Sequence, residues 1–349
     1  MIITHCRWIS SEKGRKILKG KHRGIAITGS GSAKPKQVLT NQDLTHIVET
    51  SDEWISSRTG IQQRQIAKPS QSLSELATEA GKKAISMAGI TPEQIDLIIL
   101  ATSTPDDLFG SGSKIQHQLG ATRAVAFDLT AACSGFVFGL VTASQFIRTG
   151  VYQNVLLVGA DILSRWVDWS DRTTCVLFGD GAGAVVVSGT EAKDSLLGFE
   201  MCSDGSQNAC LNAIYCPESE TLTNEVAIAK GIYQPIKMNG REVYRFALEK
   251  VPEVLEKALF RANISVEQVD WLILHQANQR IIDAVAQRLG IPPEKVISNV
   301  ANYGNTSAAS IPLALDEAVG QGKIKPGDTI ASSGFGAGLT WGAAIFQWG

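Results

Sequence analysis

Three side chains of this 349-residue chain combine residue types that could carry out acyl transfer: Cys133, His275 and Asn305. Cys133 lies in LTAACSGF, His275 in ILHQAN and Asn305 in NYGNTS, and each follows an apolar segment. A thiol can accept an acyl group, while an imidazole and an amide can donate N–H groups to a developing oxyanion. The three residues are therefore the leading candidates for a catalytic site.

Cys133 is expected at a turn between a strand and a helix. An apolar strand over residues 125–129 runs into Thr-Ala-Ala-Cys-Ser-Gly, and a segment with helical spacing follows. The N-terminus of a helix favours a thiolate, so we expect the pKa of Cys133 to be lowered. A free cysteine is also often a small buried residue, and spacing alone leaves both interpretations open. Cys175 lies in an apolar run and is expected in the core.

The segment that ends in His275 repeats an earlier one. Residues 90–104 read ITPEQIDLIILATST and residues 264–278 read ISVEQVDWLILHQAN. The apolar run ends at Ala101 in the first copy and at His275, 174 positions later, in the second. Neither run shows polar alternation, which is typical of a strand buried on both faces of a largely parallel sheet.

The repeat predicts a duplicated α/β fold. Residues 155–161 are echoed at 329–336, and Asn305 falls in the loop that corresponds to the Cys133 turn. Ligands bind at the carboxyl ends of the strands in such sheets. We expect a half over residues 24–190 that carries the nucleophile and a half over residues 191–349 that carries the histidine and the asparagine.

Composition excludes several classes of partner. The net charge of −2 gives no basic surface for nucleic acid or an anionic membrane, and no apolar window is long enough to span a bilayer. Six cysteines without a C-x-x-C pair indicate a reduced protein of the cytoplasm or an organellar stroma, with no metal site. Residues 1–23 form a basic arm, which is consistent with a transit peptide, a mobile arm or an upstream start codon.

Five ordered motifs resemble one known family. They are TSDEWISSRTGI, LTAACSGF, ILHQAN, YGNTSAASIP and GFGAGLTWG. Together they resemble the β-ketoacyl-acyl carrier protein synthase III family, of the thiolase-like fold, from Arg23 to Gly349. The resemblance implies an α/β fold with two mixed, mainly parallel five-stranded sheets in a layered αβαβα arrangement.

The resemblance also implies catalytic roles. Cys133 would accept the acyl group of an acyl-CoA, and His275 and Asn305 would promote decarboxylation of a malonyl group carried by acyl carrier protein. The backbone N–H groups of Cys133 and Ala337 would form the oxyanion hole; many relatives have Gly where Ala337 stands, but a main-chain donor does not depend on the side chain. The coenzyme A thioester is the substrate, and no cofactor is implied.

Binding residues follow from the same motifs. Those matched to coenzyme A are Trp54, Arg58, Arg172, Gly240 and Asn278, and those matched to the carrier protein are Arg245 and Arg280. The family forms homodimers and often places a Phe in the acyl pocket of the partner. Leu108 and Phe109 occupy that loop here, which leaves the preferred acyl chain open.

The sequence therefore predicts an initiating condensing enzyme of fatty acid synthesis, with acetyl as the expected primer. Two alternatives are a polyketide-type priming ketosynthase that takes a different acyl-CoA and a Cys-His-Asn thioester hydrolase. A nucleotide-binding interpretation of GSGSAKPK fails because neither the G-x-x-x-x-G-K-[ST] nor the G-x-G-x-x-G spacing is present.

Overall fold

A computed structural model describes residues 23–349, so the predicted basic arm lies outside the described residues except for Arg23. The first of its two large sheets has the strand order β1-β7-β6-β4-β5. Its strands are β1 (Gly24–Ala33), β7 (Asp180–Thr190), β6 (Asn154–Ile162), β4 (Leu97–Ala101) and β5 (Val125–Leu129). Only β7 runs against the other four strands, because its pairings with β1 and β6 are antiparallel.

The second sheet repeats this arrangement in the order β14-β13-β15-β16-β8. Its strands are β14 (Val296–Ile297), β13 (Trp271–Leu274), β15 (Thr329–Gly336), β16 (Thr340–Gln347) and β8 (Leu196–Ser203). Here β13 is parallel to both of its neighbours, and β16 is antiparallel to both of its own. The predicted fold of two mixed, mainly parallel five-stranded sheets is confirmed.

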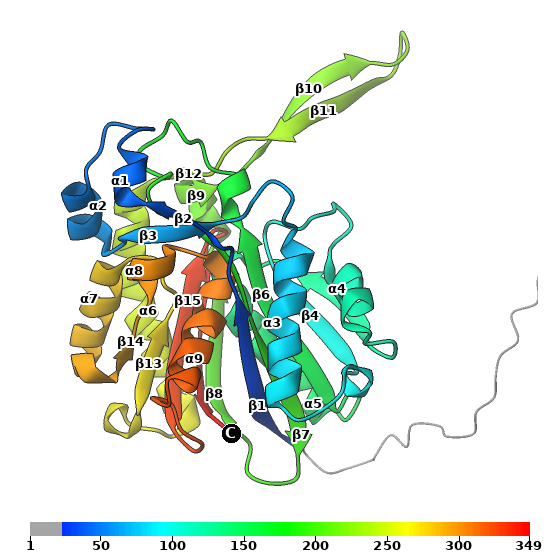
Figure 1. Cartoon of the computed structure of the whole chain (residues 1–349), viewed down its shortest axis with the longest axis vertical. Helices are drawn as coiled ribbons and strands as arrows, with labels where there is room; N and C mark the ends of the chain where they lie inside the picture. Colours follow the sequence, from blue (N-terminus) through cyan, green and yellow to red (C-terminus); the bar gives the residue numbers. More distant parts are fainter. Residues whose placement is uncertain (1–22) are drawn as a thin grey trace, which may run out of the picture.

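Helices form three layers around the two sheets (Figure 1). α5 (Gly135–Arg148) and α9 (Ser310–Gly320) pack between the sheets in one apolar core. The outer faces are covered by α3 (Leu73–Met87) and α4 (Gly112–Leu119) on one sheet, and by α6 (Gly240–Ala262) and α7 (Gln279–Leu289) on the other. Ser72 and Glu75 form a reciprocal capping box at the start of α3.

The unbroken apolar run of β4 is explained by burial on both faces. Leu97 and Ile99 point into the central core, while Ile98 and Leu100 point into the core beneath α3. All four side chains have zero exposure. A strand between two helical layers has no solvent face, so no polar alternation is needed.

Smaller elements cover the carboxyl ends of the central strands. They are β2 (Gln37–Thr40), α1 (Asn41–Leu44), α2 (Asp52–Thr59), β3 (Gln63–Ile66), β9 (Leu211–Asn212), β12 (Lys237–Met238) and α8 (Val300–Tyr303). The hairpin of β10 (Tyr215–Thr221) and β11 (Ala227–Tyr233) projects away from the body (Figure 1). Short 3-10 turns are η1 (Pro92–Gln94), η2 (Ala132–Ser134), η3 (Leu163–Arg165), η4 (Gly205–Cys210), η5 (Val266–Gln268), η6 (Pro293–Lys295) and η7 (Ser307–Ala309). Within residues 23–349, every helix is too short or too polar to cross a bilayer.

Candidate active site

Cys133 lies in η2, the tight turn that joins β5 to α5. Ala132, just before it, has a φ of 45°, so the chain reverses sharply at this point. Two glycines of β15 make room for the turn. A Cβ on Gly334 would lie 2.9 Å from the Cys133 carbonyl oxygen, and one on Gly336 would lie 2.7 Å from the Cys133 nitrogen. The close approach of the turn to β15 therefore requires glycine at both positions.

The backbone N–H of Cys133 is free to bind an oxyanion. Within residues 23–349 no other residue accepts a hydrogen bond from it, and the N–H of Ala337, the first residue after β15, likewise has no acceptor. Gly336, whose Cβ position would lie 2.7 Å from the Cys133 nitrogen, immediately precedes Ala337 in the sequence. The two free donors thus lie on adjoining segments, as the predicted oxyanion hole requires.

His275 follows β13 and is almost completely buried, with 1% exposure. The Ser310 hydroxyl lies 2.7 Å from His275 Nδ1 and accepts a hydrogen bond from the Gln276 N–H at 3.3 Å. Nδ1 is the one acceptor within reach of the Ser310 hydroxyl among residues 23–349, so we assign the hydroxyl proton to Nδ1 and the ring proton to Nε2. Burial lowers the pKa of His275 to about 3, so the imidazole is a neutral Nε2–H donor at neutral pH.

Asn305 is held at both its backbone and its side chain. Its N–H donates to the Leu177 carbonyl at 2.8 Å, and its carbonyl accepts from the Gly179 N–H at 3.0 Å, so Phe178 and Asn305 form an isolated parallel bridge. Its Oδ1 accepts the Ser307 N–H at 2.8 Å. The amide oxygen is thereby fixed toward Ser307, and the NH₂ group faces the other way as a donor.

A chain of contacts gathers the three candidate residues at the carboxyl ends of β13 and β15. The His275 N–H donates to the Ser333 carbonyl at 2.8 Å, one residue before the Gly334 position that supports Cys133. On the other side, the Ser307 N–H donates to Asn305 Oδ1 at 2.8 Å, and η7, which begins at Ser307, packs against η2, which contains Cys133. Thiol, imidazole and amide are all more than nine-tenths buried.

The correspondence between the halves differs by one residue from the sequence prediction. His275 is level with Ala101, 174 positions earlier, but η7 (Ser307–Ala309) matches η2 (Ala132–Ser134) at a distance of 175. Ser307 and Ala132 share a positive φ, of 50° and 45°, which fixes this register. Cys133 therefore corresponds to Ala308. The second half has one extra residue between β13 and β15, and only strand pairing reveals it.

The expected low pKa of Cys133 is wrong for the free protein. Burial raises the pKa of its thiol to about 12, and the negative charge of Asp161 acts in the same direction. Cys133 also precedes α5, which begins at Gly135, so it occupies a separate turn outside the helix. Desolvation outweighs the favourable field of the helix N-terminus here.

The residues matched to coenzyme A form an aromatic and cationic group at the protein surface. The guanidinium of Arg58 lies 4.8 Å from the centre of the Trp54 ring, and that of Arg172 lies 5.0 Å from it. Asn278, the N-cap of α7, donates from Nδ2 to the Arg58 carbonyl at 3.0 Å. The structure thus brings four of the five residues together. Gly240 is an exposed residue at the start of α6.

The remaining predicted residues are exposed. Arg245 is paired with Glu242 at 3.5 Å, and the guanidinium of Arg280 lies over the Tyr244 ring at 5.4 Å. Leu108 and Phe109 are 83% and 96% exposed. They line a hollow beside β5 together with Thr102, Pro105, Gly110, Gly112, Ser113, Ala126, Phe127, Asp128 and Thr130. Two large apolar side chains in this position are unusual for a surface that stays in water.

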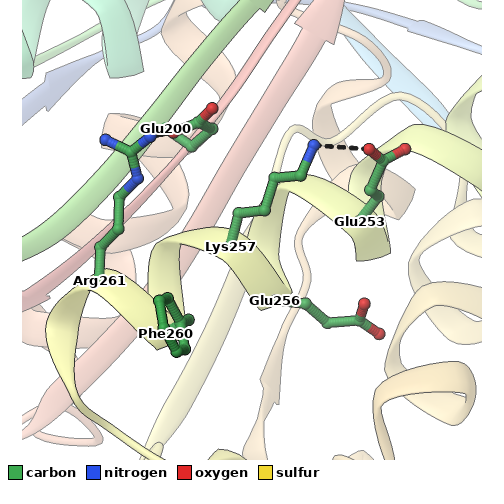
Figure 2. A pocket seen from close by; sticks show the side chains of 6 residues that line it. All are labelled: Glu200, Glu253, Glu256, Lys257, Phe260 and Arg261. Carbon is green, nitrogen blue, oxygen red and sulfur yellow. Dashed lines mark hydrogen bonds and ion pairs between the residues drawn. The ribbon is translucent and has the colours of Figure 1, made fainter.

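Another hollow lies on the outer face of α6 (Figure 2). Both of its cations are already paired with carboxylates, because Lys257 lies 2.6 Å from Glu253 and Arg261 lies 2.6 Å from Glu200. It contains no residue predicted to act in catalysis or binding. The described residues also hold no group of three or more His, Cys, Asp and Glu side chains suited to a metal ion.

Sequence reasoning missed four residues of the site: Asp161, Ser307, Ser310 and Gly336. Ser310 could have been found from the motif YGNTSAASIP, because it lies five positions after Asn305 in that motif. Gly336 occupies the end of an apolar strand, where a close approach of backbone is a common reason for glycine. Asp161 and Ser307 lie 146 positions apart and gave no local signal.

Comparison with known proteins decides the family. Models of the C-terminal part and of a second segment of 3-oxoacyl-[acyl-carrier-protein] synthase III match residues 259–348 and 127–205. The β-ketoacyl-[acyl-carrier-protein] synthase III of Trichormus variabilis is 71% identical over 326 residues, which cover 93% of this chain and 98% of that protein. The chain belongs to the β-ketoacyl-[acyl-carrier-protein] synthase III family.

Solved structures agree with this assignment. The crystal structure of 3-oxoacyl-[acyl-carrier-protein] synthase III from Aquifex aeolicus matches with a TM-score of 0.86 and 48% identity, over 93% of this chain and all of that one. The priming β-ketosynthase of the R1128 polyketide pathway matches with a TM-score of 0.85 and 32% identity, over 94% and 97% of the two chains. The predicted family, thiolase-like fold and enzyme class, a condensing acyltransferase that initiates fatty acid synthesis, are confirmed.

Proposed function

We propose that Cys133 takes the acyl group, with acetyl as the expected primer, from an acyl-CoA. The sulfur attacks the thioester carbonyl, and the oxygen that becomes negative receives the free N–H groups of Cys133 and Ala337. Donors that are already in place in a desolvated site stabilise this charge without reorganisation. Coenzyme A leaves, and an acyl-Cys133 thioester remains.

The second step is decarboxylative condensation with malonyl-acyl carrier protein. Loss of CO₂ from the malonyl thioester leaves an enolate, to which His275 donates from Nε2 and Asn305 from its NH₂ group. The enolate carbon then attacks the acyl-Cys133 carbonyl and expels the thiol. The two halves divide this work: residues 24–190 supply the nucleophile and residues 191–349 supply the enolate site.

The observation that carries the proposal is the fixed orientation of these two donors. The Ser310 hydroxyl sets the tautomer of His275, and the Ser307 N–H sets the orientation of the Asn305 amide. A neutral imidazole suits an enolate because it donates a hydrogen bond without protonating the carbon that must react. A general base for hydrolysis would need a pKa nearer to neutrality than about 3.

Binding of both substrates is proposed for one face of the protein. The planar Trp54 ring and the guanidinium of Arg172 would stack on an adenine, and Arg58 and Asn278 would contact its phosphates near Gly240. Arg245, in the second turn of α6, and Arg280, in the first turn of α7, would meet the acidic surface of the carrier protein. We expect this reaction in the cytoplasm or in an organellar stroma.

We also propose a homodimer joined through β5. This strand is the edge of its sheet within the described residues and pairs only with β4, while its first residue, Val125, is 52% exposed. Unprotected edges pair readily with other strands, and two copies of one edge related by a twofold axis pair in antiparallel fashion. The loop with Leu108 and Phe109 lies beside this edge and would enter the acyl pocket of the partner.

A priming ketosynthase that takes a different acyl-CoA is the second candidate. The similarity to the R1128 priming enzyme supports it, and the loop residues Leu108 and Phe109 leave the acyl chain open. The chemistry at Cys133 would be the same, so only the primer separates the two candidates.

Intact mass spectrometry tests the proposal directly. The protein is incubated with acetyl-, branched and longer acyl-CoAs, and peptide mapping locates the adduct. We expect acetyl transfer to Cys133 in the native chain and no stable adduct in Cys133→Ala. Faster transfer of a longer acyl group would favour the priming ketosynthase, and an adduct on Cys202, Cys210 or Cys216 would contradict the assignment of the nucleophile. A monomer with full activity at micromolar concentration would contradict the dimer.

A further inference from the structure

Arg64, in β3, carries a guanidinium that the proposed steps do not use, and its side chain has zero exposure. Nη1 donates to the Leu39 carbonyl at 3.2 Å and to Asn41 Oδ1 at 2.8 Å, and Nη2 donates to the Val176 carbonyl at 2.7 Å. None of these acceptors is charged, and Nε has no hydrogen-bond partner among residues 23–349. A buried cation that is not paired with a carboxylate is costly, so its presence calls for a function.

The stem of Arg64 lies over the isolated bridge between Phe178 and Asn305. A Cβ on Gly179 would lie 3.1 Å from the Arg64 Cβ, and one on Gly304 would lie 3.5 Å from it. These glycines are the chain neighbours of the two bridge residues, one in each segment. The Arg64 side chain therefore begins where the two segments of the bridge meet.

The guanidinium of Arg64 holds one of these segments in place. Its Nη2 binds the Val176 carbonyl, and the next carbonyl, that of Leu177, accepts the Asn305 N–H at 2.8 Å. The bridge consists of this hydrogen bond and the one from the Gly179 N–H to the Asn305 carbonyl at 3.0 Å. So short a pairing depends on its surroundings for stability. The guanidinium supplies this support by joining the segment to β2 and α1.

Asn41, which accepts from Arg64, is itself fixed. Its side chain is buried, and its Nδ2 donates to Asp52 Oδ1 at 2.8 Å and to the Ile61 carbonyl at 2.7 Å. With the amide nitrogen held in this way, Oδ1 stays directed at the guanidinium. Arg64 is thus anchored on the side of α2, which begins at Asp52, and reaches from there to the segment that pairs with Asn305.

We propose that Arg64 is a positioning residue for decarboxylation: it fixes the segment that holds the backbone of Asn305, and with it the amide that donates to the enolate. The inference rests on the proposed function of Asn305 as that donor. The effect should be confined to the enolate step, because the turn of Cys133 is supported by β15 at Gly334 and Gly336.

The chemistry of arginine suits this task. Burial lowers the pKa of Arg64 to about 10, so the guanidinium still carries its charge at neutral pH. Hydrogen bonds from a charged donor are stronger than those between neutral groups. The planar fork also directs its two terminal nitrogens to acceptors on different segments, which the compact ammonium group of a lysine cannot do.

Arg64→Met is the decisive variant, because it removes the charge and all the donors but keeps an unbranched stem. Replacement of a buried ion by an apolar side chain of similar volume often leaves the fold intact. We expect the rate of CO₂ release from malonyl-acyl carrier protein to fall about 10- to 10²-fold with little change in KM, since a shift of about 1 Å at a reacting group can cost this much. Acylation of Cys133 by acetyl-CoA should stay within about threefold of native.

Two controls separate positioning from a general effect on the fold. Added to Asn305→Ala, Arg64→Met should cause no further fall in CO₂ release, because the amide that it positions is already absent. Arg148→Met removes another partly buried guanidinium, which pairs with Asp194 at 2.7 Å and donates to the Leu196 carbonyl at 3.0 Å. Arg148 ends α5, about 20 Å from the N-terminus of this helix beside the nucleophile, and its loss should leave both rates unchanged.

Arg64→Lys provides the same test if the methionine variant unfolds, because its single ammonium group cannot span the three acceptors. CO₂ release at the native rate in both variants, with Asn305→Ala slow, would overturn the positioning role and leave Asn305 as the enolate donor. An equal fall in acylation, or a further fall in the Asn305→Ala background, would show that Arg64 only supports the fold. Native CO₂ release from Asn305→Ala itself would overturn the proposed function and this inference with it.

Discussion

The two halves of the molecule carry different side chains at the same four places of one frame. Ala101 and Gly135 of the first half correspond to His275 and Ser310 of the second. In the first half a Cβ on Gly135 would lie 3.1 Å from the Ala101 Cβ, whereas in the second the Ser310 hydroxyl holds the imidazole at 2.7 Å. The Ala101 methyl group only packs against its neighbours, whereas the His275 imidazole at the corresponding place is an oriented hydrogen-bond donor.

The second difference is the reverse of the first. Asp161 of the first half covers the N–H of Ala308, while its counterpart in the second half, Gly336, leaves the N–H of Cys133 uncovered. One turn is therefore closed by a carboxylate, and the other is open to an oxyanion. The site therefore depends as much on the absence of a side chain at Gly336 as on the imidazole at His275.

Closing the open turn should have the largest effect. In Gly336→Ala the new Cβ would lie 2.7 Å from the Cys133 nitrogen, so the nucleophile must shift and its N–H is obstructed. We expect acylation by acetyl-CoA to fall by about 10³-fold, the upper range for loss of an oxyanion donor. Quenched-flow acylation measures it. Gly181→Ala is the buried control: its Cβ would lie 3.2 Å from the Leu313 side chain and at ordinary contact distance, 3.6 Å, from the Thr306 side chain. It should stay within about threefold of native.

Making the second half resemble the first should remove decarboxylation. His275→Ala places alanine where the first half has Ala101, and it should slow CO₂ release from malonyl-acyl carrier protein by about 10²–10³-fold. Asn305→Ala should act similarly, and the double variant should lose less than the product because both donors serve one oxygen.

Self-acylation of Cys133 should survive better in these variants, and radiolabelled acyl transfer is the matched assay. The opposite pattern, with acylation lost and CO₂ release retained, would make His275 the base for the thiol and end the division of labour between the halves.

The buried imidazole of His275, which has no counterpart in the first half, should make the protein less stable in acid. The pKa of His275 is about 3 in the folded chain and near 6.5 when unfolded, so below pH 6.5 the unfolded chain binds a proton that the folded one does not. Stability should therefore fall as pH drops from 6.5, by about 2 kcal/mol at pH 5. Urea unfolding at pH 7 and pH 5 tests this. In His275→Gln the free energy of unfolding should fall less between pH 7 and pH 5 than in the native chain. An equal fall would mean that another group titrates.

Substrate-binding residues outside the repeated frame should give the smallest effect. Trp54→Ala removes the ring that faces the guanidinium groups of Arg58 and Arg172. We expect KM for acetyl-CoA to rise about tenfold, because stacking at a partly exposed site contributes about 1 kcal/mol or slightly more. The rate of acylation at saturation should hardly change. A large fall in that rate with constant KM would mean that Trp54 supports the fold of the site.

Sequence patterns predicted what depends on local order. The apolar runs before Ala101 and His275 are strands, and Cys133 follows a strand in a tight turn, because burial on two faces and small turn residues leave direct marks in a sequence. Trp54 is half-buried beside the guanidinium groups of Arg58 and Arg172, and its role in binding coenzyme A stays a prediction.

What depended on packing between distant segments was missed or wrong. The pKa of Cys133 is set by desolvation between two halves, so a favourable local helix did not decide it. The single-residue shift between the copies is visible only once β13 and β15 are paired. Asp161 and Ala308, whose N–H donates to the Asp161 carboxylate at 3.2 Å, come from different halves, and no pattern within one segment joins them.

The glycines at level positions of β6 and β15 have a consequence for how such a molecule can change over generations. A Cβ on Gly159 would lie 2.2 Å from the Ala308 carbonyl oxygen, as one on Gly334 would lie 2.9 Å from that of Cys133. The two turns therefore meet the opposite strand backbone to backbone, without side chains between them. A side chain at either glycine would clash with the opposite backbone, so we expect substitutions to be tolerated around this contact rather than at it, and a duplicated gene could then change its chemistry there while the junction of its halves stays the same.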